Sequence, residues 1–529
     1  SSAASDVYKR QPQPGRDTRP GYPGPMRVGI DLGTTRTVIA SVDRGNYPVL
    51  SVEDADGNLH EHIPTVIGLN NDALLCGWDA LAADAGRGEI ARSFKRLLSL
   101  PDATGATPVR IGARERSLAE VMNAFAAHVI AQIRRSARCA ADDPIEVVLG
   151  VPAHAHSAQR LLTLDAFARA GATVLGLVNE PSAGAFEFTH RHPRFVTSRR
   201  TAVVVYDLGG GTFDASVVRV EGTDHVVERS IGIPHLGGDD FDAVLANCAV
   251  RAAADDTADG AQAGIDPSDP AVLDAARLAK ERVLPQTRRM LIELEDADAT
   301  VSVADFYDAA TPLVEQTLEA MEPLVTSSTL AAADEAATTE DELAGIYLVG
   351  GAAALPLVGR MLRQEFGRRV HRSPYPSAST AIGLAIAADP ESGYRLRDRL
   401  SRGIGVFREA QDGREVTFDP LVPPGAAPRA DGSLSVTRHY RAAHNVGWFR
   451  YVEFPATDGR EASGDLTALA QVVVPFDPVL RDGRDLSRVQ VERRGDGPWV
   501  EETVHVDANG ITTIRLTLED GYTVETSAL

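Results

Sequence analysis

Hydrophobic and polar positions follow two different patterns along the chain. Up to about residue 389, short apolar runs such as Glu146–Val151 and Ile346–Val349 predict strands. They alternate with segments of helical period at Ala158–Ala170, Pro270–Leu284, Ser302–Val325 and from about Leu355. This alternation predicts an α/β domain with largely parallel sheets.

Residues typical of helix ends predict where two of the helices begin or end. Ser117 and Glu120 form a capping-box pattern ahead of apolar residues that continue at helical spacing through Ile133. Ser157 precedes the helix Ala158–Ala170 and is expected to cap it, and Gly171 is expected to end it.

The pattern changes after Asp389-Pro390. From Gly403 onward, short alternating segments are separated by Gly, Pro, Asp and Asn, and the turn Asp507-Ala-Asn-Gly510 joins the last two long ones as a hairpin. Residues 403–529 therefore predict a separate all-β domain of ~125 residues. Residues 390–402 form the linker, and residues 26–389 form the α/β domain.

Two segments of the α/β domain have the same form. A strand beginning at Val28 ends in Asp31-Leu-Gly-Thr-Thr35, and a strand beginning at Val203 ends in Asp207-Leu-Gly-Gly-Gly-Thr212. The two aspartates lie 176 positions apart, which is too far for a solenoid repeat. The spacing predicts two duplicated α/β lobes.

These two turns carry the candidate chemistry. A strand that ends in a glycine turn leaves several N–H groups pointing the same way, which favours an anion. Gly33 and the three glycines Gly209, Gly210 and Gly211 allow close approach, while Thr34, Thr35 and Thr212 add hydroxyl donors. Asp31 and Asp207 would repel phosphate, so we expect them to hold Mg²⁺. Either turn alone could be an ordinary hairpin with a solvated aspartate, but the duplicated pair favours a polyphosphate site.

Composition and charge narrow the function. The net charge is −21, from 74 acidic and 53 basic residues, which argues against a nucleic-acid or anionic-membrane ligand. No apolar run is long enough to span a bilayer, and residues 1–25 are expected to be a disordered leader. Cys76, Cys139 and Cys248 are widely spaced, which favours free thiols and a cytoplasmic location.

Other nucleotide and metal motifs are missing from the sequence. Lys9, Lys95 and Lys280 are the only lysines, and none follows a glycine, so a P-loop cannot occur. The sequence also holds no G-x-G-x-x-G opening a helix and no H-E-x-x-H.

Several motifs together resemble the 70-kDa heat-shock chaperone family, which shares an actin-like nucleotide fold. The matching pieces, in family order, are Gly29–Thr35, Phe94–Leu98, Val151–Ala153, Val178–Gly184, Tyr206–Asp214, His235–Asp242 and Leu348–Gly351. The segments Phe418–Gly425 and Val504–Ile511 resemble the family's peptide-binding β-sandwich more loosely. The resemblance implies an actin-like ATPase domain of two lobes followed by that sandwich.

The resemblance also implies roles for single residues. Lys95, Glu180, Asp207, Thr212 and Asp214 are implied to act on the γ-phosphate and the attacking water, consistent with catalysis by positioning and charge. The resemblance implies that Gly238, Lys280, Gly350 and Gly351 line the nucleotide. It also implies that Pro152 and Arg160 form the switch between the two domains. By residue type alone, Lys95 could be a surface lysine and Glu180 an acidic residue at a helix start.

Several positions depart from the family pattern. The family holds adenine between two arginines, but Glu281 and Ala354 occupy those positions here, and Arg277 replaces a glutamate. Ser377 and Ala378 replace an acidic pair. Losing two arginine contacts could weaken ATP binding by about one to three decades, unless Arg277 compensates.

The parts outside the nucleotide domain differ too. The linker Tyr394–Arg399 is basic where the family's is hydrophobic and acidic, and Gly176 replaces an arginine that contacts J-domain cochaperones. No helical lid follows the β domain, so a bound peptide is expected to leave faster.

The sequence predicts an ATPase and chaperone that uses ATP or ADP with Mg²⁺ and binds unfolded or extended client peptides. A J-domain cochaperone and a nucleotide exchange factor are possible partners. One alternative is a nucleotide-gated regulatory protein with little or no turnover. Another, a small-molecule kinase of the same fold, is disfavoured because the C-terminal domain is sandwich-like.

Overall fold

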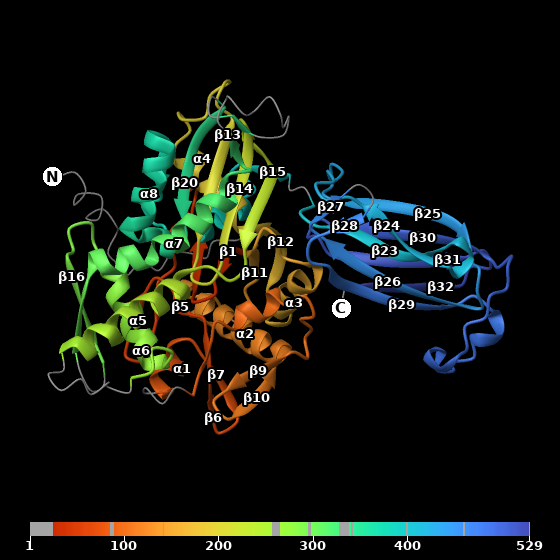
Figure 1. Ribbon diagram of the computed structural model, residues 1–529, viewed down its shortest axis with the longest axis horizontal. Helices are drawn as coiled ribbons and strands as arrows, with labels where there is room; N and C mark the ends of the chain where they lie inside the picture. Colours follow the sequence, from red (N-terminus) through yellow and green to blue (C-terminus); the bar gives the residue numbers. More distant parts are fainter. Residues whose placement is uncertain are drawn as a thin grey trace.

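The computed structural model describes residues 25–527 except 85–88, 141, 257–264, 295–297, 327–337, 340–341, 398–399 and 459–460. A two-lobed α/β part is followed by a separate β part at its side (Figure 1). The predicted leader, apart from Pro25, lies outside the described residues.

The first lobe contains a five-stranded sheet in the order β12-β11-β1-β2-β5. β1 (Met26–Leu32) and β12 (Thr173–Asn179) flank β11 (Ile145–Val151) in parallel, whereas β2 (Arg36–Ser41) runs antiparallel to β1. α2 (Leu118–Ala137) and α3 (Ser157–Arg169) bury their apolar faces against this sheet. The smaller elements are β3 (Val52–Glu53), β4 (Leu59–His60), β5 (Ile63–Pro64), β6 (Val66–Asn70), β7 (Ala73–Cys76), α1 (Trp78–Asp84), β8 (Ala91–Arg92), η2 (Phe94–Ser99), β9 (Pro108–Ile111) and β10 (Arg114–Ser117).

The second lobe contains a six-stranded sheet in the order β21-β20-β13-β14-β15-β22. β13 (Ala202–Leu208) pairs in parallel with β20 (Leu343–Val349) and antiparallel with β14 (Phe213–Glu221), which pairs with β15 (Asp224–Ile233). Four helices share a core with one face of this sheet: α5 (Gly238–Asp256), α6 (Pro270–Glu281), α7 (Val303–Met321) and α8 (Pro356–Phe366). The smaller elements are β16 (Arg289–Glu293), β17 (Asp298–Ser302), β18 (Val325–Thr326), β19 (Thr338–Thr339), η3 (Ala352–Ala354), η4 (Gly367–Arg369) and β21 (Val370–Arg372).

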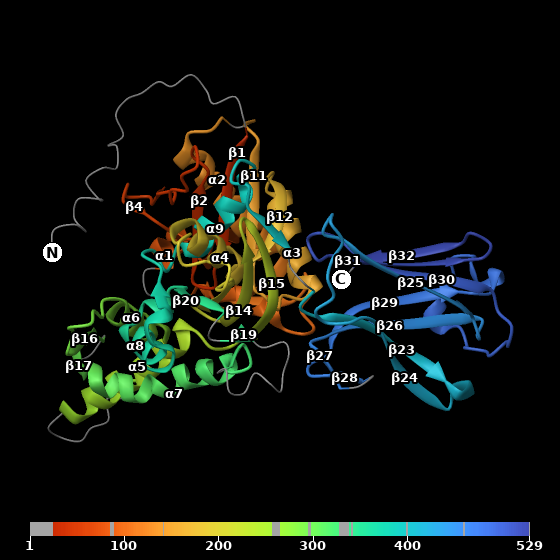
Figure 2. The same ribbon diagram turned by 90° about the horizontal axis from the view of Figure 1, so that it is seen from above.

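Two helices, α4 (Glu180–Arg191) and α9 (Ser379–Ala388), cross between the two sheets. Ala183 of α4 and Leu384 of α9 share a buried cluster with Val148 of the first sheet, and Phe188 of α4 packs on the second. A Cβ at Gly383 would lie 1.8 Å from the carbonyl oxygen of Ala183, so only glycine allows this crossing. Figure 2 shows α4 and α9 next to each other, and their packing on both sheets ties the two lobes together.

The linker becomes part of the second sheet. β22 (Arg395–Arg397) pairs in parallel with β15, with Leu396 opposite His225. Leu396 also packs on the cluster that holds Phe188 and Val203. The basic composition therefore does not prevent the linker from docking, because the strand pairs through its backbone and partly buries one leucine.

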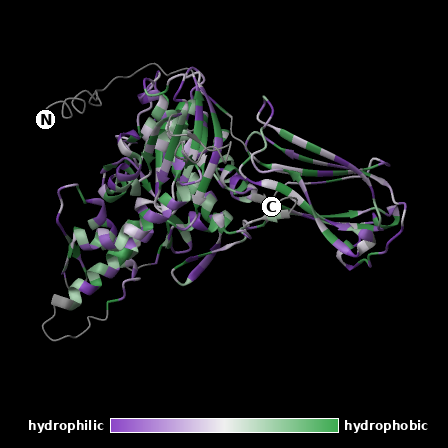
Figure 3. Cartoon of the chain, turned by 45° about the horizontal axis from the view of Figure 1, so that its top comes forward, coloured by the Kyte–Doolittle hydropathy of each residue, from purple (hydrophilic) through white to green (hydrophobic). Residues whose placement is uncertain are grey.

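The β domain is a sandwich of two four-stranded antiparallel sheets. One has the order β24-β23-β26-β29, with β23 (Gly403–Ala410), β24 (Glu415–Val422), β26 (Val446–Phe454) and β29 (Thr467–Pro475). The other has the order β25-β30-β31-β32, with β25 (Leu434–Arg441), β30 (Trp499–Val506), β31 (Thr512–Leu518) and β32 (Thr523–Ser527). Hydrophobic and hydrophilic positions alternate along these strands (Figure 3), as expected for strands with one buried face. The connections contain η5 (Gln411–Gly413), β27 (Ala456–Asp458), β28 (Glu461–Ser463), η6 (Pro478–Leu480) and η7 (Leu486–Arg488).

The predicted fold class, a duplicated α/β domain followed by an all-β sandwich, is confirmed. The capping box of Ser117 and Glu120 is also present. The expected cap at Ser157 was wrong: α3 begins at Ser157, and the side chain of His156 accepts from the N–H of Gln159 instead. The hydroxyl of Ser157 bonds to Glu453 in the β domain, so a tertiary contact replaced the local cap. Among the described residues, no helix combines the length and apolar character that crossing a bilayer requires.

Candidate functional site

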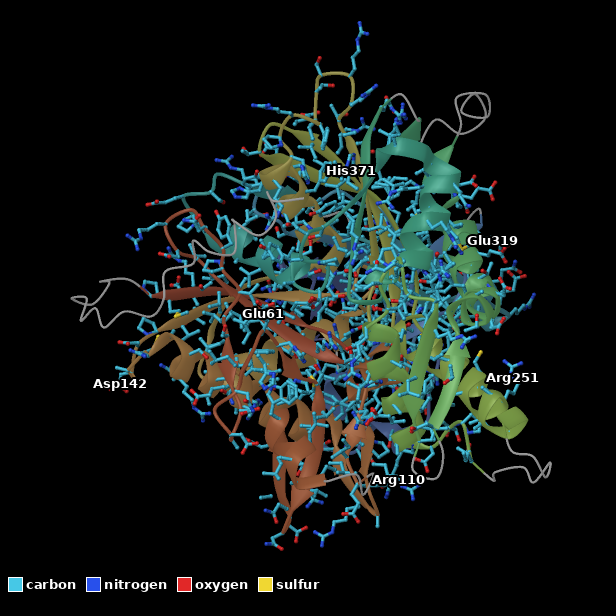
Figure 4. All side chains as sticks on the ribbon, turned by 90° about the vertical axis from the view of Figure 1, so that its left-hand side faces the viewer. Glu61, Arg110, Asp142, Arg251, Glu319 and His371 are labelled. Carbon is cyan, nitrogen blue, oxygen red and sulfur yellow. The ribbon has the colours of Figure 1, made fainter. Side chains whose placement is uncertain are left out.

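The two Asp-Leu-Gly turns face each other across the space between the lobes. A Cβ at Gly210 would lie 2.4 Å from the hydroxyl oxygen of Thr35, and one at Gly211 would lie 2.7 Å from Cγ2 of Thr34. The turns therefore meet at contact distance, and a larger residue at either glycine would push the lobes apart. Figure 4 looks onto both lobes: Glu61, Arg110 and Asp142 mark the outside of the first, and Arg251 and Glu319 that of the second.

A buried ion pair lies between the turns. Nζ of Lys95 donates to Oε1 of Glu180 at 2.7 Å, and both residues are only 7% exposed. η2 carries Lys95, and Glu180 is the first residue of α4, directly after β12. Burial by itself would lower the pKa of Lys95, but the carboxylates of Glu180 and Asp31 outweigh it, so the pKa lies above its ordinary value. The lysine therefore stays charged in this cleft.

Three aspartates surround this pair. Burial raises the pKa of Asp31, Asp207 and Asp214 well above the ordinary carboxyl range, and the charge of Glu180 raises it further. Lys95 interacts with the charges of Glu180, Asp31 and Asp214, and its charge in turn lowers the pKa of Asp207. Such an excess of negative charge in a buried space is unfavourable without a cation.

The donor set at the turns fits a hydrated divalent cation. Asp31 and Asp207 end equivalent strands of the two sheets and line the same cleft. Within the described part of the chain, no group of three His, Cys, Asp or Glu side chains could hold a metal ion by itself. Mg²⁺ is typically held by one or two carboxylates together with phosphate oxygens and waters, so these residues fit a cation that arrives with a nucleotide.

Most of the residues singled out from the sequence line this one cleft. They are Asp31, Gly33, Thr34, Thr35, Lys95, Glu180, Asp207, Gly209, Gly210, Thr212, Gly238, Lys280, Gly350 and Gly351. Asp214 and Gly211 do not line it directly. Asp214 is 5% exposed and bonds to Thr212, and the carbonyl of Gly211 accepts from Nη2 of Arg96 at 3.0 Å.

At the positions where the resemblance implies that arginines stack on adenine, the structure has an ion pair. Glu281 bonds to Arg36, which comes from the other lobe, and both line the cleft. Nε and Nη2 of Arg277 donate to Asp242 at 3.0 Å and Asp239 at 3.2 Å. Arg277 is therefore held by carboxylates and does not replace the missing stack.

Other contacts across the cleft escaped the sequence analysis. Oγ of Ser93 donates to Asp239 at 2.8 Å, and Arg96 approaches Asp240 at 3.3 Å. Arg92 of β8 pairs with Asp274 of α6 at 2.5 Å. Arg96 follows Lys95 directly, and Asp239 and Asp240 belong to the segment His235–Asp242, so adjacency to residues already singled out was the signal for their contacts. Asp274 lies outside that segment, in α6, and carried no such signal. These contacts close the two lobes over the turns.

The β domain contacts the first lobe at β12, directly before Glu180. Nη2 of Arg160 donates to Oδ1 of Asn179 at 2.7 Å, and Nη1 of Arg160 donates to the carbonyl of Asn509 at 3.3 Å. Asn509 in turn accepts from the N–H of Leu177 at 3.0 Å. Asn179 directly precedes Glu180, which lines the cleft. The β30–β31 hairpin of the β domain is therefore linked to the cleft through Arg160 and Asn179.

The sequence is similar to known proteins over most of its length. A family model described as Hsp70 protein matches residues 27–400. The chaperone protein HscA of Yersinia enterocolitica is 33% identical over 540 aligned positions, which cover 95% of this chain and 77% of that protein. HscA of Serratia proteamaculans is 32% identical and that of Escherichia fergusonii 34% identical, each covering 72% of this chain. The chain spans 62% of the length of each of these two relatives.

Proposed function

The chain belongs to the Hsp70 family of ATP-dependent chaperones, and we propose that it hydrolyses ATP slowly in the cleft between its lobes and thereby controls peptide binding by its β domain. One observation carries the proposal. Two aspartate-led glycine turns meet at contact distance over the buried pair of Lys95 and Glu180. That arrangement is suited to a polyphosphate and to the water that attacks it.

Each group of residues in the cleft has its own role in the proposed reaction. N–H groups of the two turns and the hydroxyls of Thr34 and Thr35 bind the phosphate oxygens. Glu180 orients the attacking water and accepts its proton, and Lys95 holds Glu180 in place while its charge balances the terminal phosphate. Closure of the lobes excludes other water from the reaction.

Asp31 and Asp207 are the proposed residues for Mg²⁺, supported by the unbalanced carboxyl groups around them. Bound with the nucleotide, Mg²⁺ would neutralise phosphate charge. Asp214 and Thr212 then keep the second turn in shape, since the hydroxyl of Thr212 bonds to Asp214.

The proposed domains are residues 26–389 for nucleotide, 390–402 for the linker and 403–529 for client peptides. Extended or unfolded segments are the proposed clients. We propose a J-domain cochaperone and a nucleotide exchange factor as partners. Position 176 is a glycine here, where the family has the arginine that contacts J-domain cochaperones. The three cysteines are free thiols, which supports a reducing cytoplasm as the proposed location.

Asp207→Ala tests the site. We expect this variant to fold, because the aspartate ends a strand and faces the cleft, and to lose at least 100-fold in Mg²⁺-dependent single-turnover hydrolysis. Asp56→Ala, at an exposed turn, is the matched control and should keep the wild-type rate. Turnover that persists in folded Asp207→Ala rejects the site, and wild-type protein that binds ATP without turnover indicates the nucleotide-gated alternative.

A further inference from the structure

The strand β21 forms one edge of the sheet in the second lobe. It pairs with β20 in parallel, with His371 opposite Tyr347 and Arg372 opposite Leu348. Among the described residues, no strand pairs with the outer side of β21. The docked linker strand β22 is at the opposite edge of the same sheet, so linker docking leaves β21 open. An open edge offers backbone N–H and C=O groups to an added strand.

The face of β21 toward α8 is basic. Val370 shares a buried cluster with Leu362 of α8, and Arg372 lies on the same face because side chains alternate along a strand. Burial and the charge of Arg363, on α8, lower the pKa of Arg372, so the two guanidinium groups lie near each other. Within the described part of the chain, no carboxylate pairs with Arg363, Arg368 or Arg372, and all three are exposed. Positive charge without a carboxylate partner attracts an anionic group from outside.

The other face of β21 is aromatic. His371 stacks on Phe195 with 4.6 Å between ring centroids, and His192 lies 5.3 Å from Phe195 by the same measure. Phe195 is nevertheless 42% exposed. Charged side chains alone are enough to keep an edge strand from pairing with another copy of the chain. An exposed ring beside them adds nothing to that protection, but it provides a contact for an apolar side chain.

The charge of the whole protein limits the kind of partner. The net charge is −21, so the arginines beside β21 are a local exception. Figure 4 shows His371 apart from Glu319 and Asp142, which mark acidic positions on the outside of the two lobes. A long polyanion such as a nucleic acid would continue onto acidic surface, where charges within the Debye length of about 8 Å repel it. A short acidic segment can end within the basic face.

We propose that β21 binds a short extended segment of a partner protein in which acidic and apolar residues alternate. Added as a strand, such a segment directs its side chains to the two faces in turn. Its carboxylates meet Arg363 and Arg372, and its apolar side chains meet Phe195 and His371. This surface is independent of the nucleotide cleft and of peptide binding by the β domain.

A labelled peptide Glu-Val-Glu-Val-Glu-Val-Glu tests the proposal on the full chain by fluorescence anisotropy. The double variant Arg363→Glu with Arg372→Glu should lower the affinity at least about tenfold, because it replaces attraction by repulsion. The matched control is Arg110→Glu with Arg251→Glu, which changes the net charge equally at exposed positions away from β21 (Figure 4). The control should stay within about twofold of wild type.

Two further comparisons test the alternation of side chains. Phe195→Ala should weaken binding of the peptide about 3-fold, the size of one aromatic contact. A peptide of the same composition, with its glutamates first and its valines last, should bind wild type at least about 3-fold more weakly, because it cannot serve both faces at once. Circular dichroism verifies that each variant is folded.

Several results would overturn the proposal. They are absence of binding, equal affinity for wild type and the Arg363→Glu, Arg372→Glu variant, and tighter binding of an oligothymidine of about 20 nucleotides than of the peptide. Displacement of the peptide by unfolded carboxymethylated lactalbumin would instead place it in the β domain and leave the proposed chaperone function standing.

One acidic segment of the chain itself lies outside the described residues and is tested separately. The combined variant Asp334→Asn, Glu335→Gln, Glu340→Gln and Asp341→Asn removes its charge. Affinity for the peptide should change by less than about twofold. A rise of more than about tenfold would identify this segment as the occupant of β21 and overturn the proposal of a separate partner.

Discussion

Individual residues decide which chemistry the cleft supports. Lys95 and Glu180 are 85 positions apart in the chain, yet they form a buried pair 2.7 Å long because η2 and the start of α4 meet between the turns. Removing either partner would leave an uncompensated buried charge, which is more costly than losing both. At the expected base position, Glu281 forms an ion pair with Arg36 across the cleft.

Ala354→Arg tests this view of the base position. The new guanidinium would lie on the wall of the cleft where a base enters and should tighten ATP binding by about 2- to 30-fold, the range of a cation–π contact. Isothermal titration measures the effect. Ala354→Leu controls for added bulk, and equal affinity of the arginine variant and wild type would contradict the assignment of this wall to the base.

At the scale of elements, a helix start joins the two domains. The carboxylate of Glu453, 6% exposed on β26, accepts from the N–H of Ser157 at 3.1 Å and from its hydroxyl at 2.5 Å. A carboxylate is favoured at this end of α3 because the first N–H groups of a helix are unpaired and carry partial positive charge. This contact holds the sandwich against the first lobe.

Glu453→Ala should therefore release the sandwich. It leaves the buried hydroxyl of Ser157 with fewer partners, at a cost of about 1–3 kcal/mol, which shifts the docked population by about 5- to 150-fold. Small-angle scattering should report a larger radius of gyration, and trypsin should cut the linker 390–402 faster. Glu501→Ala, with an exposed side chain on β30 of the same domain, is the control, and an unchanged scattering curve in Glu453→Ala would reject the latch.

The docked linker gives a second prediction at this scale, with a defined pH window. His225 is 0% exposed opposite Leu396, and burial lowers its pKa to about 4. A histidine with a lowered pKa folds in its neutral form, so stability is complete above the unfolded pKa of about 6.5 and falls as the pH drops toward 4. The loss reaches about 3 kcal/mol.

His225→Asn keeps a donor for the carbonyl of Thr223, which Nδ1 of the histidine approaches at 3.0 Å, and removes the titration. In urea unfolding between pH 7.5 and pH 5, the variant should lose less stability than wild type does. His439→Asn, whose side chain is 63% exposed, should behave like wild type. If the stability of wild type and of His225→Asn fell equally as the pH dropped, this histidine would not be the cause of the loss of stability at low pH.

The whole molecule is arranged so that one cleft joins two lobes and the β domain rests on one of them. Each lobe supplies one turn, and the crossing of α4 and α9 keeps the turns in contact. The cleft holds more carboxyl groups than cations, so closure over a polyphosphate needs added positive charge.

Removal of Mg²⁺ should therefore weaken ATP binding but leave the stability of the nucleotide-free protein unchanged. With ATP, addition of EDTA should lower ATP affinity at least tenfold and reduce the rise in melting temperature that ATP causes. Without nucleotide, EDTA should leave the melting temperature unchanged, because no three side chains among the described residues form a metal site by themselves. An equal ATP-induced shift with and without EDTA would contradict the role of Asp31 and Asp207.

The local parts of this protein followed from the sequence alone. The strand, glycine turn and hydroxyl residues after Asp31 and Asp207 lie within a few positions, so turn chemistry and period-2 burial are readable there. The change of pattern after Asp389, the capping box at Ser117 and the duplicated architecture were determined in the same way.

Contacts between distant segments were decided only by the tertiary structure. Ser157 was expected to cap a helix locally, but its hydroxyl donates to Glu453, 296 positions away. The partners of Arg277, the pairing of Arg36 with Glu281 and the bridge between His444 and Arg493 also left no local signal. The physical reason is that hydrogen bonds and charges are satisfied by whichever groups the folded chain brings within about 3 Å, and sequence spacing does not encode that choice.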